Sequence, residues 1–255
     1  MNLSKAKAAW ISSLQIKKFR LKNHKFVVEG DKIVQELLRT PAWEVAELYA
    51  LPAWLTAHTD LLQGRGILVA AVSEEELKKI SAHPTPNHAV AVVTPQKMAP
   101  RREVLCSDLS LFLDGIQDPG NLGAILRIAD WFGIAHVFLG PGTVDLFNPK
   151  VIQASMGAFL RLCVQERELA DLRGEYPELT LVGADLEGQD VFAYHRPTVG
   201  GLLLVVGNEG NGISDANRGL LDAYLTIPAA KGGGAESLNA AVAAGILCAV
   251  LRHGR

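Results

Sequence analysis

From residue 109 onward, continuous apolar runs alternate with stretches whose apolar residues recur at helical spacing. The runs are "LSLFLDG", "AHVFLG", "LRLCVQ", "LTLVGAD", "LLLVVG" and "AYLTIP". Helices are predicted at 121–132, in "PKVIQASMG", at 166–174, in "SDANRGLLD" and at 237–252. Apolar strands that alternate with helices are typical of a parallel sheet covered on both faces, so the pattern predicts an α/β domain.

The first 95 residues carry a smaller pattern of the same kind. A strand and a helix are predicted in "FVVEGDKIVQELLR", further strands in "ELYAL", "ILVAAV" and "HAVAVVTP", and a helix in "SEEELKKI" capped by Ser73. The segment "TPQKMAPRREV" has two prolines and several charges, as linkers often do. We therefore predict a small domain at 1–95, a linker at 96–104 and a second domain at 105–255.

The composition narrows the class of protein. Of 255 residues, 49% are hydrophobic and 20% charged, which supports folded cores and excludes a disordered chain. Cys106, Cys163 and Cys248 lie far apart without metal-ligand spacing, which argues against a disulfide framework and against a metal site. No signal-like segment and no apolar run of bilayer length is visible. We expect a cytoplasmic protein without a metal or a membrane partner.

Charge is unevenly distributed along the chain. Residues 1–40 hold nine Lys or Arg against three acidic residues, whereas residues 101–255 hold twelve against eighteen. A basic segment on an acidic body suggests contact with a polyanion. The plainer interpretation, the solvated face of a helix, explains the charge equally well.

Three loops rich in Gly and Asn follow predicted strands: "DPGNLG", "GNEGNG" and "IPAAKGGGAESLN". In parallel sheets, ligands bind where such loops leave the carboxyl ends of strands. Glycines at 207, 210 and 212 have the reverse of the dinucleotide spacing, and "AAKGGGAES" lacks the order of a P-loop. Both observations argue against a nicotinamide enzyme or an NTPase. Any one of the loops alone could be an ordinary turn.

Taken in order, the loops resemble the three signature motifs of the SpoU/TrmH family of RNA ribose 2′-O-methyltransferases, in the SPOUT superfamily. The matching segments are "DPGNLGAILRIADWFGI", "LVVGNEGNGIS" and "LTIPAAKGGGAESLNAAVAAGI", within residues 108–252. The segment "ISSLQIKKFRLKNHKFVVEGDKIVQELL" is similar to the family's substrate-binding domain, which resembles ribosomal protein L30e. The third motif is longer here than is usual in the family, so contacts within 229–235 are expected to differ.

The resemblance implies methyl transfer from S-adenosylmethionine to a ribose 2′-hydroxyl of structured RNA, with ribosomal RNA favoured over transfer RNA. It also implies an L30e-like domain at 1–95 and a deep trefoil knot in the second domain. A homodimer is expected through that second domain, with an active site built by two subunits. The alternative is a catalytically inactive RNA-binding module on the same fold, against which the intact motif residues argue.

The resemblance assigns catalytic roles to Asn121, Arg127, Glu209, Ser237 and Asn239. Because an arginine stays protonated, we interpret Arg127 as a residue that binds phosphate and stabilises the developing alkoxide, rather than as a base. The alternative is a structural arginine paired with Asp130 or Glu209. Asn121 could hold Arg127 or the ribose and cap its helix, and Glu209 could orient Arg127.

Ser237 is also a plausible cap for the last predicted helix. For the cofactor, the resemblance points to Gly207, Ile227 and Leu238, and more weakly to Asn208, Pro228 and Ala184. For RNA phosphates, the basic segment offers Lys17, Lys18, Arg20, Lys22 and Lys25.

Overall fold

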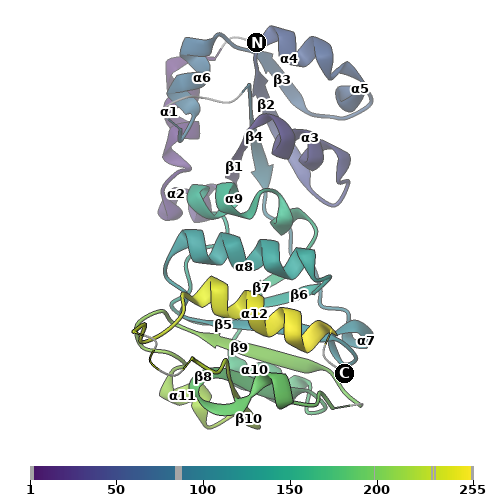
Figure 1. Cartoon of the computed structure of the whole chain (residues 1–255). Coiled ribbons are helices and arrows are strands. Elements are labelled where there is room, and N and C mark those ends of the chain that lie inside the picture. Colours follow the sequence, from purple (N-terminus) through teal and green to yellow (C-terminus); the bar gives the residue numbers. More distant parts are fainter. Residues whose placement is uncertain (1–2, 84–87, 198, 231, 233, 254–255) are drawn as a thin grey trace. The chain divides into compact units, whose positions relative to one another are not determined.

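The structure, a computed structural model, describes residues 3–83, 88–197, 199–230, 232 and 234–253. It divides into two compact units (Figure 1). The first comprises Met1–Lys97 together with Asp145–Leu160, and the second comprises Met98–Val144 and Arg161–Arg255. The predicted division at 96–104 did not anticipate that residues 145–160 fold with the first unit.

The first unit is a four-stranded sheet with helices on it. The strand order is β1-β4-β2-β3, with β4 antiparallel to both β1 and β2 and with β3 parallel to β2. Helices α1 and α6 pack together over an apolar core that includes Ile11, Leu77 and Val92. The strands are β1 Phe26–Glu29, β2 Glu44–Ala50, β3 Leu68–Ala71 and β4 Ala89–Thr94. The helices are α1 Lys5–Ser13, α2 Lys17–Asn23, α3 Asp31–Arg39, α4 Pro52–Ala57, α5 Thr59–Leu62 and α6 Glu74–Ile80.

Residues 145–160 join this unit through aromatic packing. They form α9 Pro149–Ser155 and the short helix η1 Ala158–Leu160. Phe147 stacks on Phe26 with ring centroids 4.2 Å apart, and the Trp43 indole donates to the Leu160 carbonyl at 3.1 Å. The helix predicted in "PKVIQASMG" is therefore present, but in the first unit.

Arg20 is part of this packing and is only 6% exposed. Its Nε and Nη2 atoms donate to Asp145 Oδ2 at 3.0 and 2.5 Å. Its Nη1 atom donates to the carbonyls of Leu14 and Gln15 at 2.9 and 2.7 Å. With its guanidinium committed to the fold, Arg20 is a structural residue, which corrects its assignment as a phosphate contact.

The second unit is the predicted parallel sheet. Its six strands follow the order β10-β8-β9-β5-β6-β7, and every neighbouring pair is parallel. Helices α8 and α12 lie side by side (Figure 1), close enough that a Cβ on Gly245 would stand 3.4 Å from Ile128 Cδ1. The strands are β5 Leu109–Asp114, β6 His136–Leu139, β7 Cys163–Glu166, β8 Thr180–Asp190, β9 Leu202–Gly207 and β10 Ala223–Thr226. The helices are α7 Arg102–Leu105, α8 Pro119–Trp131, α10 Leu169–Glu175, η2 Val191–Ala193, α11 Asp215–Arg218 and α12 Ala240–His253.

Three helix starts in the second unit differ from the prediction, and one of them is that of α10, which begins at Leu169 rather than at residue 166. Helix α8 begins two residues early, at Pro119, because the Asp118 carboxylate accepts the backbone N–H of Asn121 and so caps the helix. Helix α12 begins at Ala240, capped by Asn239 rather than by Ser237. Asn121 and Ser237 are therefore not helix caps. The Ser73 cap of α6 is confirmed, as a full capping box.

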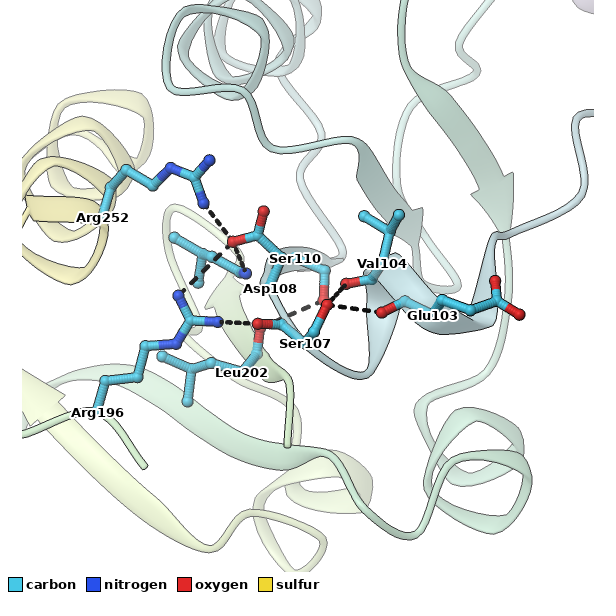
Figure 2. Close-up of polar contacts among 9 residues, drawn as sticks. Glu103, Val104, Ser107, Asp108, Ser110, Arg196, Leu202 and Arg252 are labelled. Atoms are coloured by element: carbon cyan, nitrogen blue, oxygen red, sulfur yellow. Dashed lines mark hydrogen bonds and ion pairs between the residues drawn. The ribbon is translucent and has the colours of Figure 1, made fainter. Parts of the chain in front are cut away.

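The carboxyl-terminal end of α12 is anchored at the start of β5 (Figure 2). The Asp108 carboxylate forms ion pairs with Arg252, in the last turn of α12, and with Arg196 at 3.7 Å. Arg196 also donates to the Ser107 carbonyl at 3.2 Å. One acidic residue thus fixes two later segments of the second unit.

Within the described part of the chain, no helix is long and apolar enough to cross a membrane. In the same residues, no group of three or more His, Cys, Asp or Glu side chains is arranged to hold a metal ion.

We expect Arg20→Ala to destabilise the protein by about 3–5 kcal/mol, because it leaves the part-buried Asp145 carboxylate without its partner. Urea denaturation measures the change. Lys18→Ala, on the exposed side of the same helix, is the control and should stay within about 0.5 kcal/mol of wild type. Equal stability of the two variants would contradict the structural role of Arg20.

Candidate active site

The three motif loops follow strands β5, β9 and β10 of the second sheet, of which β5 and β9 are neighbours and β10 is separated from β9 by β8. The first loop follows β5 and leads into α8, the second follows β9, and the third follows β10 and leads into α12. Asp114, the last residue of β5, pairs with Gly207, the last residue of β9. Because the strands are parallel, their carboxyl ends bring the first two loops together.

A chain of hydrogen bonds joins one residue from each motif. The Asn121 Nδ2 atom donates to Glu209 Oε1 at 2.8 Å, and the Asn239 Nδ2 atom donates to Asn121 Oδ1 at 2.9 Å. Asn239 Oδ1 in turn accepts the backbone N–H groups of Ala241 and Val242 at 2.9 and 3.2 Å. We call Glu209, Asn121 and Asn239 the amide relay.

Both ends of the relay fix the orientation of its two amides. An ionised carboxylate only accepts hydrogen bonds, so the Asn121 amide must present its NH2 group to Glu209 and its oxygen to Asn239. The N–H groups at the start of α12 only donate, so Asn239 must present its oxygen to them. The two constraints agree, and the relay therefore holds a single orientation.

Glu209 is ionised in this arrangement. Burial of its carboxyl opposes ionisation, but hydrogen bonds from Asn121 and from backbone groups outweigh it and lower its pKa. The backbone N–H groups of Gln117 and Asp118 approach its two oxygens, each at 3.4 Å. The second motif thus supplies a fixed negative charge at the start of α8.

Arg127 does not join the relay. It is exposed on α8 and makes no hydrogen bond or ion pair with any residue that the structure describes. Asp130 instead forms a bidentate pair with Arg161, at 2.8 and 2.9 Å, and Glu209 bonds Asn121. The structural ion pairs considered for Arg127 are therefore absent among the described residues, and so are bonds from Asn121 or Glu209 that would orient it.

The positions considered for the cofactor follow the same sheet edge. Ala184 lies in β8, Gly207 ends β9, and Ile227 and Pro228 come directly after β10. Leu238 precedes α12 and is 47% exposed, so it offers apolar surface there. Apolar surface beside loop backbone is what the flat ring system of a nucleoside requires, so these residues fit such a ligand.

The remaining candidates are distributed as follows. Ser237 is exposed and has no hydrogen bond with any described residue. Lys17, Lys18 and Lys22 are exposed on α2, while Lys25 donates to Thr94 Oγ1 at 2.5 Å. Asp118 was not predicted as the cap of α8, although Asp-Pro before a helix is a usual start signal.

Two family models match the chain. The SpoU rRNA Methylase family matches residues 108–249, and the MRM3-like substrate binding domain matches residues 7–91. The chain belongs to the SpoU rRNA Methylase family. The predicted family resemblance and the predicted α/β fold with its parallel sheet are thus confirmed.

Relatives support this membership over nearly the whole chain. The 23S rRNA (guanosine(2553)-2′-O)-methyltransferase RlmP of Bacillus subtilis is 34% identical over 94% of this SpoU-family chain and 93% of its own. A TrmH-family RNA methyltransferase structure from Porphyromonas gingivalis is 39% identical, with a TM-score of 0.85 over 98% of both chains. An AdoMet-bound rRNA methyltransferase structure from Sinorhizobium meliloti is 28% identical, with a TM-score of 0.87 over 99% of this chain and 96% of that one.

Proposed function

We propose that this SpoU-family protein transfers a methyl group from S-adenosylmethionine to a ribose 2′-hydroxyl of ribosomal RNA in the cytoplasm. The amide relay is the observation that carries the proposal, because it ties all three motifs into one site. The names of the relatives agree with it, since RlmP is a 23S rRNA 2′-O-methyltransferase. A module that only bound RNA would have no use for an oriented relay at the cofactor edge.

The chemistry divides between the cofactor and the chain. S-adenosylmethionine supplies a methyl group on a sulfonium, a good leaving group. The chain has to align the ribose and to favour loss of the 2′-hydroxyl proton. The Arg127 guanidinium stays charged, so it stabilises the developing alkoxide and grips the adjacent phosphate, while the proton leaves to another acceptor. Gly207, Ile227 and Leu238 would hold the cofactor, with Ala184 and Pro228 beside them.

We also propose a homodimer through α8 and α12, around a knotted second unit. Arg127 lies six positions after Asn121, which places it about 9 Å along α8 and about 240° around it, away from the relay of its own subunit. Trp131, one turn further on the same helix face, is 84% exposed, and Val242 on α12 is half exposed. An exposed tryptophan beside an arginine that has no polar partner among the described residues suits a face that a second subunit covers. Arg127 would then complete the partner's site.

The first unit would hold the RNA. The exposed lysines of α2, Lys17, Lys18 and Lys22, supply a cationic surface, and the exposed Ile16 and Leu21 lie among them. Lys25 lies at the margin of this surface. Several exposed cations on one helix suit the phosphates of a structured RNA.

Arg127→Ala should lower the methylation rate by about 10²–10³-fold, the usual effect of removing one oxyanion donor. Transfer of labelled methyl groups to ribosomal RNA measures the rate, and calorimetry should show unchanged S-adenosylmethionine affinity. Arg127→Lys should recover little, because it lacks the planar guanidinium. Arg102→Ala is the control. It removes the same charge from α7, which precedes β5 and therefore lies at the end of that strand away from the motif loops, and the variant should remain active. If Arg127→Ala unfolds the protein or methylates normally, the assignment fails.

A shared site can be tested by mixing inactive variants. When Arg127→Ala and Glu209→Gln subunits are co-expressed, half of the dimers are mixed, and each mixed dimer keeps one intact site. We expect about a quarter of wild-type activity, although each variant alone retains only a small residual activity. Sites contained within single subunits would give no recovery, and a monomer by sedimentation would rule out the dimer.

Replacing Lys17, Lys18 and Lys22 together with Ala should weaken RNA binding and reduce its logarithmic salt slope by about one unit for each lost phosphate contact. Binding measured at several salt concentrations gives the slope. Replacing Lys78 and Lys79, which are exposed on α6, with Ala is the control and should leave the salt slope unchanged. Equal slopes for the two variants would make the α2 lysines a solvated surface.

A further inference from the structure

Asn208 uses all of its side-chain hydrogen-bonding groups inside the protein. Its Nδ2 atom donates to the Gly115 carbonyl at 2.7 Å and approaches Glu209 Oε2 at 3.4 Å. Its Oδ1 atom accepts the backbone N–H groups of Gly210 and Asn211 at 2.9 and 3.0 Å. The side chain of Asn208 therefore has no free group for a cofactor, and it has no role in the function proposed above.

We infer that Asn208 is a positioning residue that holds the Glu209 carboxylate against the start of α8. Gly115 is the first residue after β5, in the loop that leads to Asp118 and Asn121. The bond from Asn208 to Gly115 thus joins the second motif loop to the first. Glu209, the next residue along the chain, is brought to Asn121 by that connection.

The two ends of the Asn208 amide do separate jobs. The oxygen shapes the turn at 208–212, which is also closed by reciprocal backbone bonds between Asn208 and Gly212 at 2.9 and 3.0 Å. The nitrogen makes the connection to the first loop. Gly115 suits this position because its φ of +75° is strained for other residues.

Because the oxygen and the nitrogen of the Asn208 amide have separate roles, one substitution can remove the second role and keep the first. Asn208→Asp keeps the oxygen that accepts from Gly210 and Asn211, but it replaces the donor with an oxygen that faces the Gly115 carbonyl and Glu209. The turn is retained and the connection is lost. Asn208→Ser is too short to reach Gly115 and adds no charge, so it repeats the test if Asn208→Asp does not fold.

The inference rests on the proposed role of Glu209, so the experiment combines both residues. We expect Asn208→Asp to lower kcat by about ten-fold or more, since the part-buried Gly115 carbonyl loses its donor. The KM for S-adenosylmethionine should change by less than about three-fold, because strand pairing with Asp114 holds Gly207 independently. In a Glu209→Gln background, Asn208→Asp should change kcat by no more than about two-fold, because the two residues act through one contact.

Asn211→Asp is the matched control. It adds the same charge to the same loop, and the Asn211 side chain is exposed without a hydrogen bond to any described residue. Its kcat should stay within about two-fold of wild type.

Three results would overturn the inference: wild-type kcat for Asn208→Asp, a loss confined to KM, or losses that multiply in the double variant. If Glu209→Gln alone is fully active, the proposed role of Glu209 fails and the inference fails with it. If Glu209→Gln is impaired but the losses multiply, only the inference about Asn208 is wrong.

Discussion

The hydrogen bond between Asn121 and Glu209 is the interaction on which the site depends. It crosses from the helix after β5 to the loop after β9, and the second bond of the relay continues to the start of α12. The parallel sheet makes the first bond possible, because it places the ends of β5 and β9 beside each other. The relay also shows why the motifs are rich in asparagine. An amide both donates and accepts hydrogen bonds, so asparagine side chains can link a carboxylate, which only accepts, to the N–H groups of a helix start, which only donate.

Much of this arrangement could be predicted from the sequence. Continuous apolar strands that alternate with helices indicated the parallel sheet, and three ordered loops indicated the edge where the site lies. Asn121, Glu209 and Asn239 were all identified as site residues, and the structure brings them into one network. The motifs did not reveal that Arg127 stands apart from the relay, since a spacing of six residues does not say where an exposed arginine finds its partner.

The errors share a physical cause, which is that local patterns do not reveal distant partners. Arg20 lies in a run of lysines and has the same charge as they do, but its carboxylate partner is 125 positions further along the chain. Residues 145–160 follow a strand of the second unit, but the aromatic contacts of Phe147 place them in the first. The starts of α8 and α12 were misplaced because several Ser, Asp and Asn residues could have capped each helix, and only tertiary contacts select among them.

The anchoring of α12 has a consequence for the timing of folding. Asp108 is among the first residues of the second unit to leave the ribosome, and its partner Arg252 follows 144 positions later. The relay likewise stays incomplete until Asn239 and the first turn of α12 have been synthesised. Contacts of such long sequence separation form slowly. The enzyme therefore cannot complete its site before α12 has been synthesised, and a nascent copy stays inactive until then.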